Sequence, residues 1–176
     1  TFTRIAQMGV DESGIGDREG RPAKRFKIHG ILRDVLRQKS VGLIEEIAEK
    51  GIRKYAKPVG VIASIIPTTN PELTPPGVGL FAMKCKDAVI FCPHPRSKQT
   101  TYEMVTVMRK VLEREGAPAD LFQCVTTPSI PLTQELMAIC DLTQATGGQQ
   151  MVRAAYSSGK PAFGVGAGNS TMVIDE

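Results

Sequence analysis

From residue 58 onward, short apolar runs alternate with segments of helical spacing, and this alternation is what most constrains the fold. Residues 59–66 and 88–92 are nearly continuous apolar runs, which are typical of strands buried on both faces. Strands that alternate with helices predict an α/β fold, with a parallel sheet and helices on both of its faces. Further strands are predicted at 121–125, 142–145, 162–165 and 172–174, and helices are predicted to begin near residues 78, 100, 131 and 147.

Two of the predicted helices carry a start signal. Thr100 is followed by Glu103, and Thr146 is followed by Gln149. This is the spacing of a capping box, in which the two side chains satisfy backbone N–H groups of the first helical turn. We therefore expect these helices to begin at the two threonines.

Residues 1–57 are polar and have weaker folding signals. Glycine and proline within 14–22 predict a loop, and the spacing of leucine and valine predicts a short helix at 29–39. Residues 41–57 fit either a helix or two strands that turn at 50–51. From these residues alone, both alternatives stay open.

The same segment is basic, with 13 Lys and Arg against 8 Asp and Glu in residues 1–57. Arg21, Lys24, Arg25 and Lys27 form its one cluster. A basic cluster can bind the phosphates of nucleic acid, but charges of both signs are mixed here. We therefore interpret the cluster as a solvated face and expect no nucleic-acid partner.

The composition is that of a soluble globular protein, with 41% apolar and 23% charged residues among 176. No apolar run reaches the roughly 18 residues of a membrane helix, and residues 1–10 lack the apolar core of a secretory leader, so no membrane partner is expected. The four cysteines have no metal-ligand spacing and there are only two histidines. We expect no metal site and a reducing, cytoplasmic setting.

Parallel α/β sheets bind ligands beyond the carboxyl ends of their strands, so the loops after the strands are candidate sites. Thr68, Thr69 and Asn70 follow the first strand, between two prolines. Their hydroxyl and amide donors could stabilise an oxyanion, or could simply cap a turn. His94 and Arg96 follow the second strand and fit either phosphate and ribose contacts or a solvated turn.

Two glycine-rich loops follow later strands. Gly147 and Gly148 precede a helix, whose N-terminus would attract a phosphate, although a plain capped helix also explains them. The glycines within 164–168 allow either close approach of a ligand or a structural bend. Neither loop has the GxGxxG or P-loop spacing, and no set of serine, histidine and aspartate can be assigned.

Together these loops carry a family resemblance. The sequence resembles the aldehyde dehydrogenase superfamily, and more narrowly its coenzyme-A-acylating branch, closely over 41–176 and loosely before. The resemblance implies a partial Rossmann-like NAD-binding domain at 58–176. It also implies that residues 1–57 hold a helix and an oligomerisation-type β-hairpin. The motifs, in the order and at the spacing of the family, lie at 58–71, 90–96, 145–148 and 155–169.

The resemblance also implies a role for individual loop residues. The oxyanion would be held by Asn70 or its neighbour Thr69. The other residues would bind NAD, with NADP as a second possibility. These implied cofactor-binding residues are Ile66, Pro67 and Thr68 along the cleft, His94, Pro95, Arg96 and Met151 around the adenosine, Gly147 and Gly148 at the pyrophosphate, and Val165 and Gly166 near the nicotinamide.

The activity implied by the resemblance is NAD-dependent oxidation of a short aldehyde to its acyl-CoA through a cysteine thioester. Hydrolytic members of the family carry a water-activating glutamate at the position of Gly164, so the thioester should wait here for coenzyme A. The family's nucleophilic cysteine lies beyond Glu176, so the chain looks like a piece of a longer enzyme. Residues 67–75 favour sulfoacetaldehyde, followed by acetaldehyde and succinate semialdehyde.

Two other functions stay open at this point. Without the nucleophile, the chain could be a nucleotide- or coenzyme-A-binding module with no catalysis. A hydrolytic aldehyde dehydrogenase is the third hypothesis, against which Gly164 argues. The expected partners are a small aldehyde, coenzyme A and further copies of the chain in a homo-oligomer.

Overall fold

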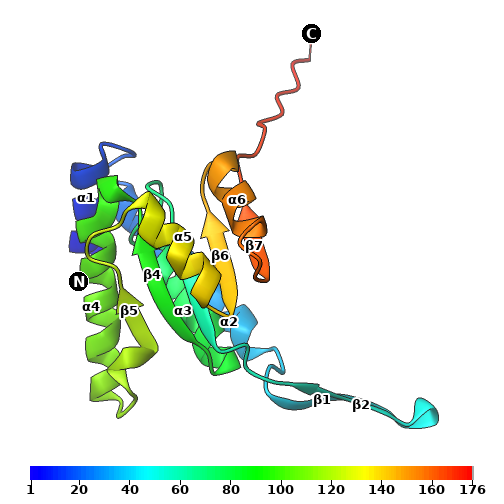
Figure 1. Ribbon diagram of the computed structural model, residues 1–176. Helices are drawn as coiled ribbons and strands as arrows, with labels where there is room; N and C mark the ends of the chain where they lie inside the picture. Colours follow the sequence, from blue (N-terminus) through cyan, green and yellow to red (C-terminus); the bar gives the residue numbers. More distant parts are fainter. Residues whose placement is uncertain (176) are drawn as a thin grey trace.

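The centre of the computed structural model, which describes residues 1–175, is a five-stranded parallel sheet (Figure 1). Glu176, the last residue of the predicted cofactor domain, lies outside the described residues. Every pairing in the sheet is parallel, so the predicted α/β class is confirmed. In the order β5-β4-β3-β6-β7, the strands are β5 (Phe122–Cys124), β4 (Ala88–Pro93), β3 (Val61–Ile66), β6 (Leu142–Thr146) and β7 (Ala162–Val165).

β3 is the central strand, and the strand order reverses beside it. The chain runs outward from β3 to β4 and β5, then crosses back to place β6 and β7 on the other side. Ile65 of β3 pairs with Cys92 of β4 on one side and with Ala145 of β6 on the other. Open α/β sheets bind ligands at such a reversal, beyond the carboxyl ends of the strands.

Helices cover both faces of this sheet. Within the described residues, the longer helices are α1 (Phe2–Ser13), α2 (Arg25–Leu36), α3 (Thr74–Cys85), α4 (Lys98–Arg114), α5 (Ile130–Ile139) and α6 (Gln149–Tyr156). Short 3₁₀ turns are η1 (Arg21–Lys24), η2 (Ala48–Lys50), η3 (Pro95–Ser97) and η4 (Ala119–Leu121).

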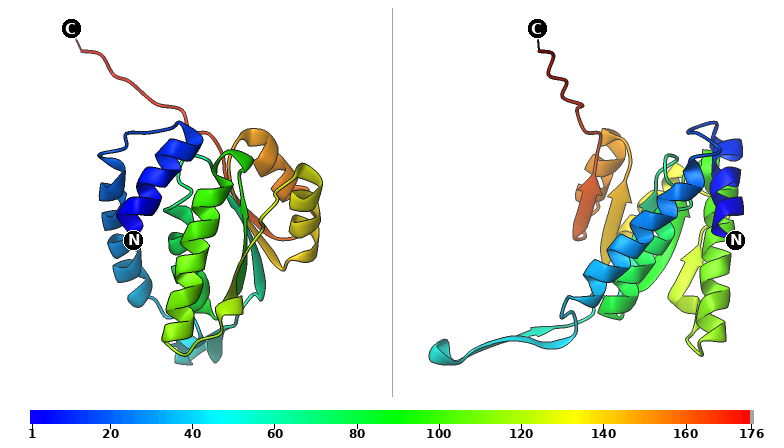
Figure 2. Two further views of the ribbon diagram at one scale, coloured as in Figure 1. Left: turned by 90° about the vertical axis from the view of Figure 1, so that its left-hand side faces the viewer. Right: turned by 180° about the vertical axis from the view of Figure 1, so that it is seen from behind.

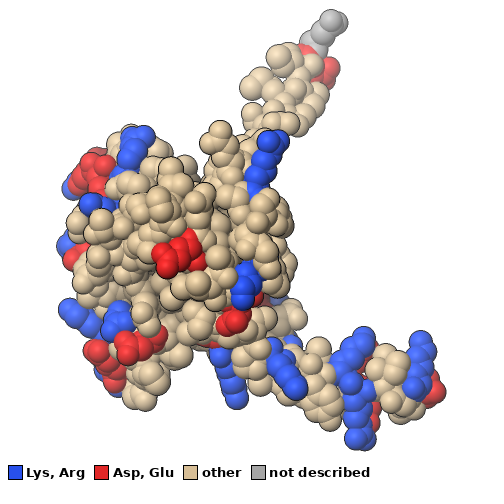
Figure 3. All heavy atoms as spheres, in the orientation of Figure 1, with Lys and Arg blue, Asp and Glu red and all other residues tan. Residues whose placement is uncertain are grey.

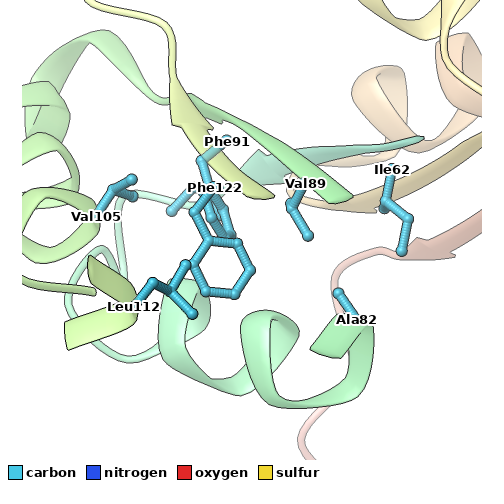
Figure 4. Close-up of a cluster of buried hydrophobic side chains, with 8 residues drawn as sticks. Ile62, Ala82, Val89, Phe91, Val105, Leu112 and Phe122 are labelled. Atoms are coloured by element: carbon cyan, nitrogen blue, oxygen red, sulfur yellow. The ribbon is translucent and has the colours of Figure 1, made fainter. Parts of the chain in front are cut away.

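The core has two halves because the side chains of β3 alternate between the faces of the sheet. Ile62 and Ile66 join a cluster with residues of α3 and α4, in which Phe91 and Phe122 have ring centroids 5.8 Å apart (Figure 4). Ala63 and its neighbours of the other face pack under α5 and α6. Burial on both faces explains why β3 and β4 are continuous apolar runs.

The first helix, α1, was not predicted from the sequence. The residues that precede the short helix expected at 29–39 are polar and irregular. It lies against α4 (Figure 2). Ile5 and Ala6 are fully buried there, and Arg4 forms an ion pair with Glu103 at 2.7 Å. The helix has one apolar stripe that only a tertiary partner covers, so its stability comes from packing on α4.

Residues 41–57 form a β-hairpin, which decides between the two alternatives left open by the sequence. Antiparallel strands β1 (Gly42–Ile47) and β2 (Ile52–Ala56) are joined at Gly51, whose φ is +61°. The hairpin projects from the body of the molecule (Figure 1), and its surface carries charges of both signs (Figure 3). An isolated hairpin of this kind is marginal in water and gains stability from a partner surface.

Both predicted capping boxes are wrong. Thr100 lies inside α4, which begins at Lys98, and its backbone N–H and hydroxyl donate to Glu12 of α1. Thr146 ends β6, and Gly148 precedes α6 with no side-chain cap. For α4, a side chain of the neighbouring helix α1 and not the local sequence caps the start of the helix.

The strand predicted at 172–174 does not form. Met172, Val173 and Ile174 are 83–89% exposed and lie in an extended segment that leaves the body after β7 (Figure 1). A strand needs a paired neighbour to satisfy its backbone groups, and no strand pairs with this segment among the described residues. Among those residues, no helix is long and apolar enough to cross a membrane.

Candidate functional site

A cavity of about 780 Å³ lies where the strand order reverses. Its walls come from the loops after β3, β4, β6 and β7 and from the turn that opens α5. The size is within the range of sites that hold small molecules and cofactors. The topology therefore brings the carboxyl-end loops together into one cleft, as the parallel sheet predicted.

Most of the residues singled out from the sequence meet in this cleft. Asn70 and Arg96 are the two that do not line it. The predicted residues that do line it are Ile66, Pro67, Thr68, Thr69, His94, Pro95, Gly147, Gly148, Met151, Val165 and Gly166.

The N-terminus of α6 opens onto the cleft without a protein cap. The residue before the helix is Gly148, so no side chain satisfies the first N–H groups, and Val152 N donates to Gly148 O at 3.1 Å. A Cβ at Gly148 would meet no atom within 4 Å. Gly147 N donates to Val165 O at 3.1 Å and ties the loops after β6 and β7 together. This arrangement of free N–H donors and positive helix dipole suits an anion.

His94 stands on the opposite wall as a neutral imidazole. Its Nδ1 accepts a hydrogen bond from Arg96 N at 3.1 Å, which places the ring proton on Nε2. Burial, and then the positive charge of Arg96, lower the pKa of His94. The ring can therefore donate one hydrogen bond through Nε2 and stack through its faces.

Arg96 points away from the cleft. Its Nη2 donates to the carbonyl oxygen of Ser13, the last residue of α1, at 2.7 Å. A cation at a helix C-terminus is favourable because the last carbonyls carry partial negative charge. The guanidinium of Arg96 is thus held by α1 here, and its phosphate or ribose contact stays a prediction.

Thr69 and Asn70, the two oxyanion candidates, differ in their surroundings. Thr69 lines the cleft, whereas the Oδ1 atom of Asn70 accepts a hydrogen bond from Lys24 Nζ at 2.6 Å. The Nδ2 atom of Asn70 donates to Thr69 Oγ1 at 3.4 Å. Of the two residues, Thr69 is therefore the one that borders the cleft.

Sequence reasoning missed a further wall of the cleft. The loop after β5 was recognised as a candidate, but no residue in it was assigned. A serine followed by a proline, between a strand and a helix, was the available sequence signal for the start of α5. Ser129 Oγ caps this helix by accepting a hydrogen bond from Leu132 N. The lining residues of this wall are Pro128, Ser129, Ile130 and Thr133.

The cysteines of the chain are poor nucleophiles. Cys92 lines the cleft, but it is buried, and its Sγ lies 3.4 Å from Thr133 Oγ1. Burial raises its pKa, and burial together with Cys92 raises the pKa of Cys124 to about 12. Burial also raises the pKa of Cys85 and Cys140. A thiol must lose its proton to attack a carbonyl, so none of the four is poised for that step.

Gly164 faces α6. A Cβ built there would lie 2.6 Å from Val152 Cγ1 and 2.9 Å from Tyr156 Cε2. The Tyr156 hydroxyl also accepts a hydrogen bond from Gly164 N at 3.0 Å. Gly164 stands where hydrolytic members of the family carry the glutamate. Two side chains of α6 occupy the space that a side chain at this position would need.

No protein-family model matches the chain, but curated relatives do. It is 49% identical over 174 residues to a sulfoacetaldehyde dehydrogenase of Acholeplasma sp, covering 98% of this chain and 36% of that protein. It is 47% identical over 176 residues to a sulfoacetaldehyde dehydrogenase (acylating) of Bilophila wadsworthia, covering 99% of this chain and 38% of that protein. The chain thus spans a little over a third of the length of these relatives.

Solved structures agree with these relatives. An acetylating aldehyde dehydrogenase from Geobacillus thermoglucosidasius superposes with a TM-score of 0.90 at 41% identity, covering 96% of this chain and 38% of that one. A propionaldehyde dehydrogenase from Rhodopseudomonas palustris, solved with bound CoA and an acylated cysteine, has a TM-score of 0.82 at 32% identity, covering 96% and 38%. Over nearly its whole length, the chain is thus similar to a part of the acylating and acetylating aldehyde dehydrogenases.

Proposed function

We propose that the chain supplies the cofactor cleft of an NAD-dependent, coenzyme-A-acylating aldehyde dehydrogenase. The observation that carries this proposal is the cleft itself. It lies at the reversal of strand order, and its walls hold nearly all the residues that the family resemblance assigns to the cofactor. Similarity to acylating enzymes over almost the whole chain supports the same activity.

The residues present fit a dinucleotide. The uncapped N-terminus of α6 would hold the pyrophosphate by its backbone N–H groups, and Gly147 and Gly148 would let the pyrophosphate come close to the chain. His94 and Met151 would flank the adenosine, and Val165 with Gly166 would border the nicotinamide end. When bound, NAD accepts the hydride that leaves the aldehyde carbon. The glycines matter because side chains there would fill the space for the cofactor.

We place the nucleophilic cysteine elsewhere in the full-length protein. All four cysteines here have raised pKa values, and only Cys92 borders the cleft. The role of this chain is to bind and orient the cofactor and to offer a hydrogen-bond donor to the oxyanion from the Thr69 loop. These groups would act on the thiohemiacetal that the cysteine forms with the aldehyde, whose loss of hydride to NAD leaves the thioester.

Coenzyme A, and not water, is the acyl acceptor in this proposal. No carboxylate occupies position 164, where Val152 and Tyr156 close the space. A thioester without a neighbouring base reacts slowly with water, but readily with a thiolate. The CoA bound in the Rhodopseudomonas palustris enzyme supports this choice of acceptor.

For the aldehyde we propose sulfoacetaldehyde, with acetaldehyde and succinate semialdehyde as the next candidates. The names of the two relatives at 49% and 47% identity support the first. A relative from Clostridium kluyveri, 40% identical, is a succinate-semialdehyde dehydrogenase (acetylating). Residues 67–75 favour sulfoacetaldehyde, and the first three of them line the cleft.

We also propose the wider setting of the chain. Residues 58–176 form the cofactor domain, and 1–57 hold the amino-terminal helices and the hairpin. The exposed apolar side chains of Leu43, Ile52 and Tyr55 on the hairpin support a homo-oligomer in which it meets another copy. Four free cysteines support a reducing, cytoplasmic compartment.

The test is NADH formation by the full-length protein, with a panel of short aldehydes and with or without coenzyme A. We expect NADH only when coenzyme A is present, and fastest turnover with sulfoacetaldehyde. NADH without coenzyme A would assign the protein to the hydrolytic type. Saturable NADH binding without turnover of any aldehyde would instead favour a binding module.

A further inference from the structure

Arg21 forms a buried clamp behind the cleft. Its Nε donates to Glu72 Oε1 at 2.7 Å, and its Nη2 donates to Glu72 Oε2 at 3.0 Å. The same Nη2 donates to the carbonyl oxygen of Thr69 at 2.6 Å. The two side chains are 3% and 0% exposed. The predicted solvated face is therefore wrong for Arg21, because its guanidinium lies in the interior and holds the loop that carries Thr69.

Lys24, one turn later in the same segment, fixes the carboxamide of Asn70. Its ammonium group has only donors, so the 2.6 Å contact must be to the amide oxygen, as observed. The amide nitrogen then faces Thr69, and Nδ2 donates to Thr69 Oγ1. The orientation of this side chain is thus set from the amino-terminal segment and not from the cleft.

The contacts form a relay that ends at the cleft. Thr69 Oγ1 accepts from Asn70, which leaves its hydroxyl proton as the donor that can point into the cleft. The positive charge of Lys24 polarises the carboxamide, which strengthens each bond along such a chain. Arg21 holds the backbone carbonyl of the same residue.

We propose that Lys24 and Arg21 are positioning residues, which act through Asn70 and the Thr69 backbone to aim the Thr69 hydroxyl at the oxyanion of the substrate. This inference rests on the proposed function, because it assumes that the cleft stabilises an oxyanion. It assigns a part in the reaction to the amino-terminal segment, which lies outside the cofactor domain as we delimit it. Thr69 is the catalytic donor in this scheme, and Asn70 transmits the orientation.

The experiment compares Lys24→Met, Lys24→Arg and Thr69→Val in the full-length protein. Lys27→Met is the matched control, because Lys27 is an exposed lysine of the same segment. We expect Lys24→Met to lower kcat about tenfold or more while KM for NAD stays within about twofold, since small misplacements of a donor are costly. Lys24→Arg should restore most of kcat, and Lys27→Met should match the wild type.

A double variant separates positioning from general loss of structure. Thr69→Val should lower kcat by about 100-fold, as expected for loss of an oxyanion donor. If Lys24 acts through Thr69, the variant with both Lys24→Met and Thr69→Val should be no slower than Thr69→Val alone, within about twofold. Multiplicative losses would overturn the relay, as would a Lys24→Met enzyme as fast as Lys27→Met. Absence of coenzyme-A-dependent NADH in the wild type would refute the proposed function instead.

Discussion

Cys92 illustrates how burial decides chemistry at the scale of one residue. Its sulfur borders the cleft where a thioester would be useful, yet it is 1% exposed and contacts the hydroxyl of Thr133. Burial disfavours the charged thiolate, and its pKa is raised. A residue type in the right place is therefore not a nucleophile unless its surroundings stabilise the anion.

We predict that Cys92→Ala keeps most of the coenzyme-A-dependent activity of the full-length protein. In the native wild type, iodoacetamide should modify Cys92 about tenfold more slowly at about pH 8 than in the denatured chain, because the thiolate is the reactive form. Because the pKa of Cys92 is raised, its rate of modification should keep rising with pH beyond the range in which the rate of an ordinary thiol levels off. Loss of activity in Cys92→Ala, with an unchanged fold, would show that the nucleophile had been misassigned.

At the scale of elements, the buried pair of Arg21 and Glu72 joins η1 to the loop before α3. Breaking such a pair leaves one charge buried without a partner. We predict that Arg21→Met lowers the free energy of unfolding by about 3–5 kcal/mol. Urea unfolding measures this, with Arg37→Met as the control, since Arg37 is exposed. A loss no larger than that of the control would mean that the pair contributes little.

Position 164 ties β7 to α6. A glutamate there would push into Val152 and Tyr156 and not into the cleft, so we predict that Gly164→Glu produces no coenzyme-A-independent turnover. Overpacking should also destabilise the protein by about 1–3 kcal/mol. NADH assays without coenzyme A and urea unfolding check both parts, with Gly168→Ala as the control because a Cβ there meets no atom. Hydrolytic turnover in this variant would contradict the geometry of α6.

The elements also show what local sequence can and cannot predict. Strands β3 and β4 were predictable because both of their faces are buried, and the loops after the strands followed from the topology. Helix α1 was not, since its stability comes from α4, far away in sequence. The start of α4 depends on Glu12. The orientation of the Arg96 side chain depends on α1, and that of the Asn70 side chain depends on Lys24. Each miss is a tertiary contact that no local pattern encodes.

At the scale of the whole molecule, the amino-terminal segment and the sheet act as one unit around the cleft. Helix α1 packs on α4 and accepts a hydrogen bond from Arg96, while α2 packs on α3. The hairpin and the segment that follows β7 both extend away from this body (Figure 2). A second hollow of about 490 Å³ lies between α4 and β5, beside Arg109 and Tyr102. We assign the cofactor to the cleft at the reversal of strand order and not to this second hollow.

Hydrogen–deuterium exchange of the full-length protein, with and without saturating NADH, tests that assignment most directly. We predict that NADH slows amide exchange in residues 68–69, 147–151 and 165–167, which surround the cleft. Exchange in 102–109 and 120–124, beside the second hollow, should stay unchanged. Protection confined to that second hollow, or none at the cleft under saturating NADH, would contradict the account.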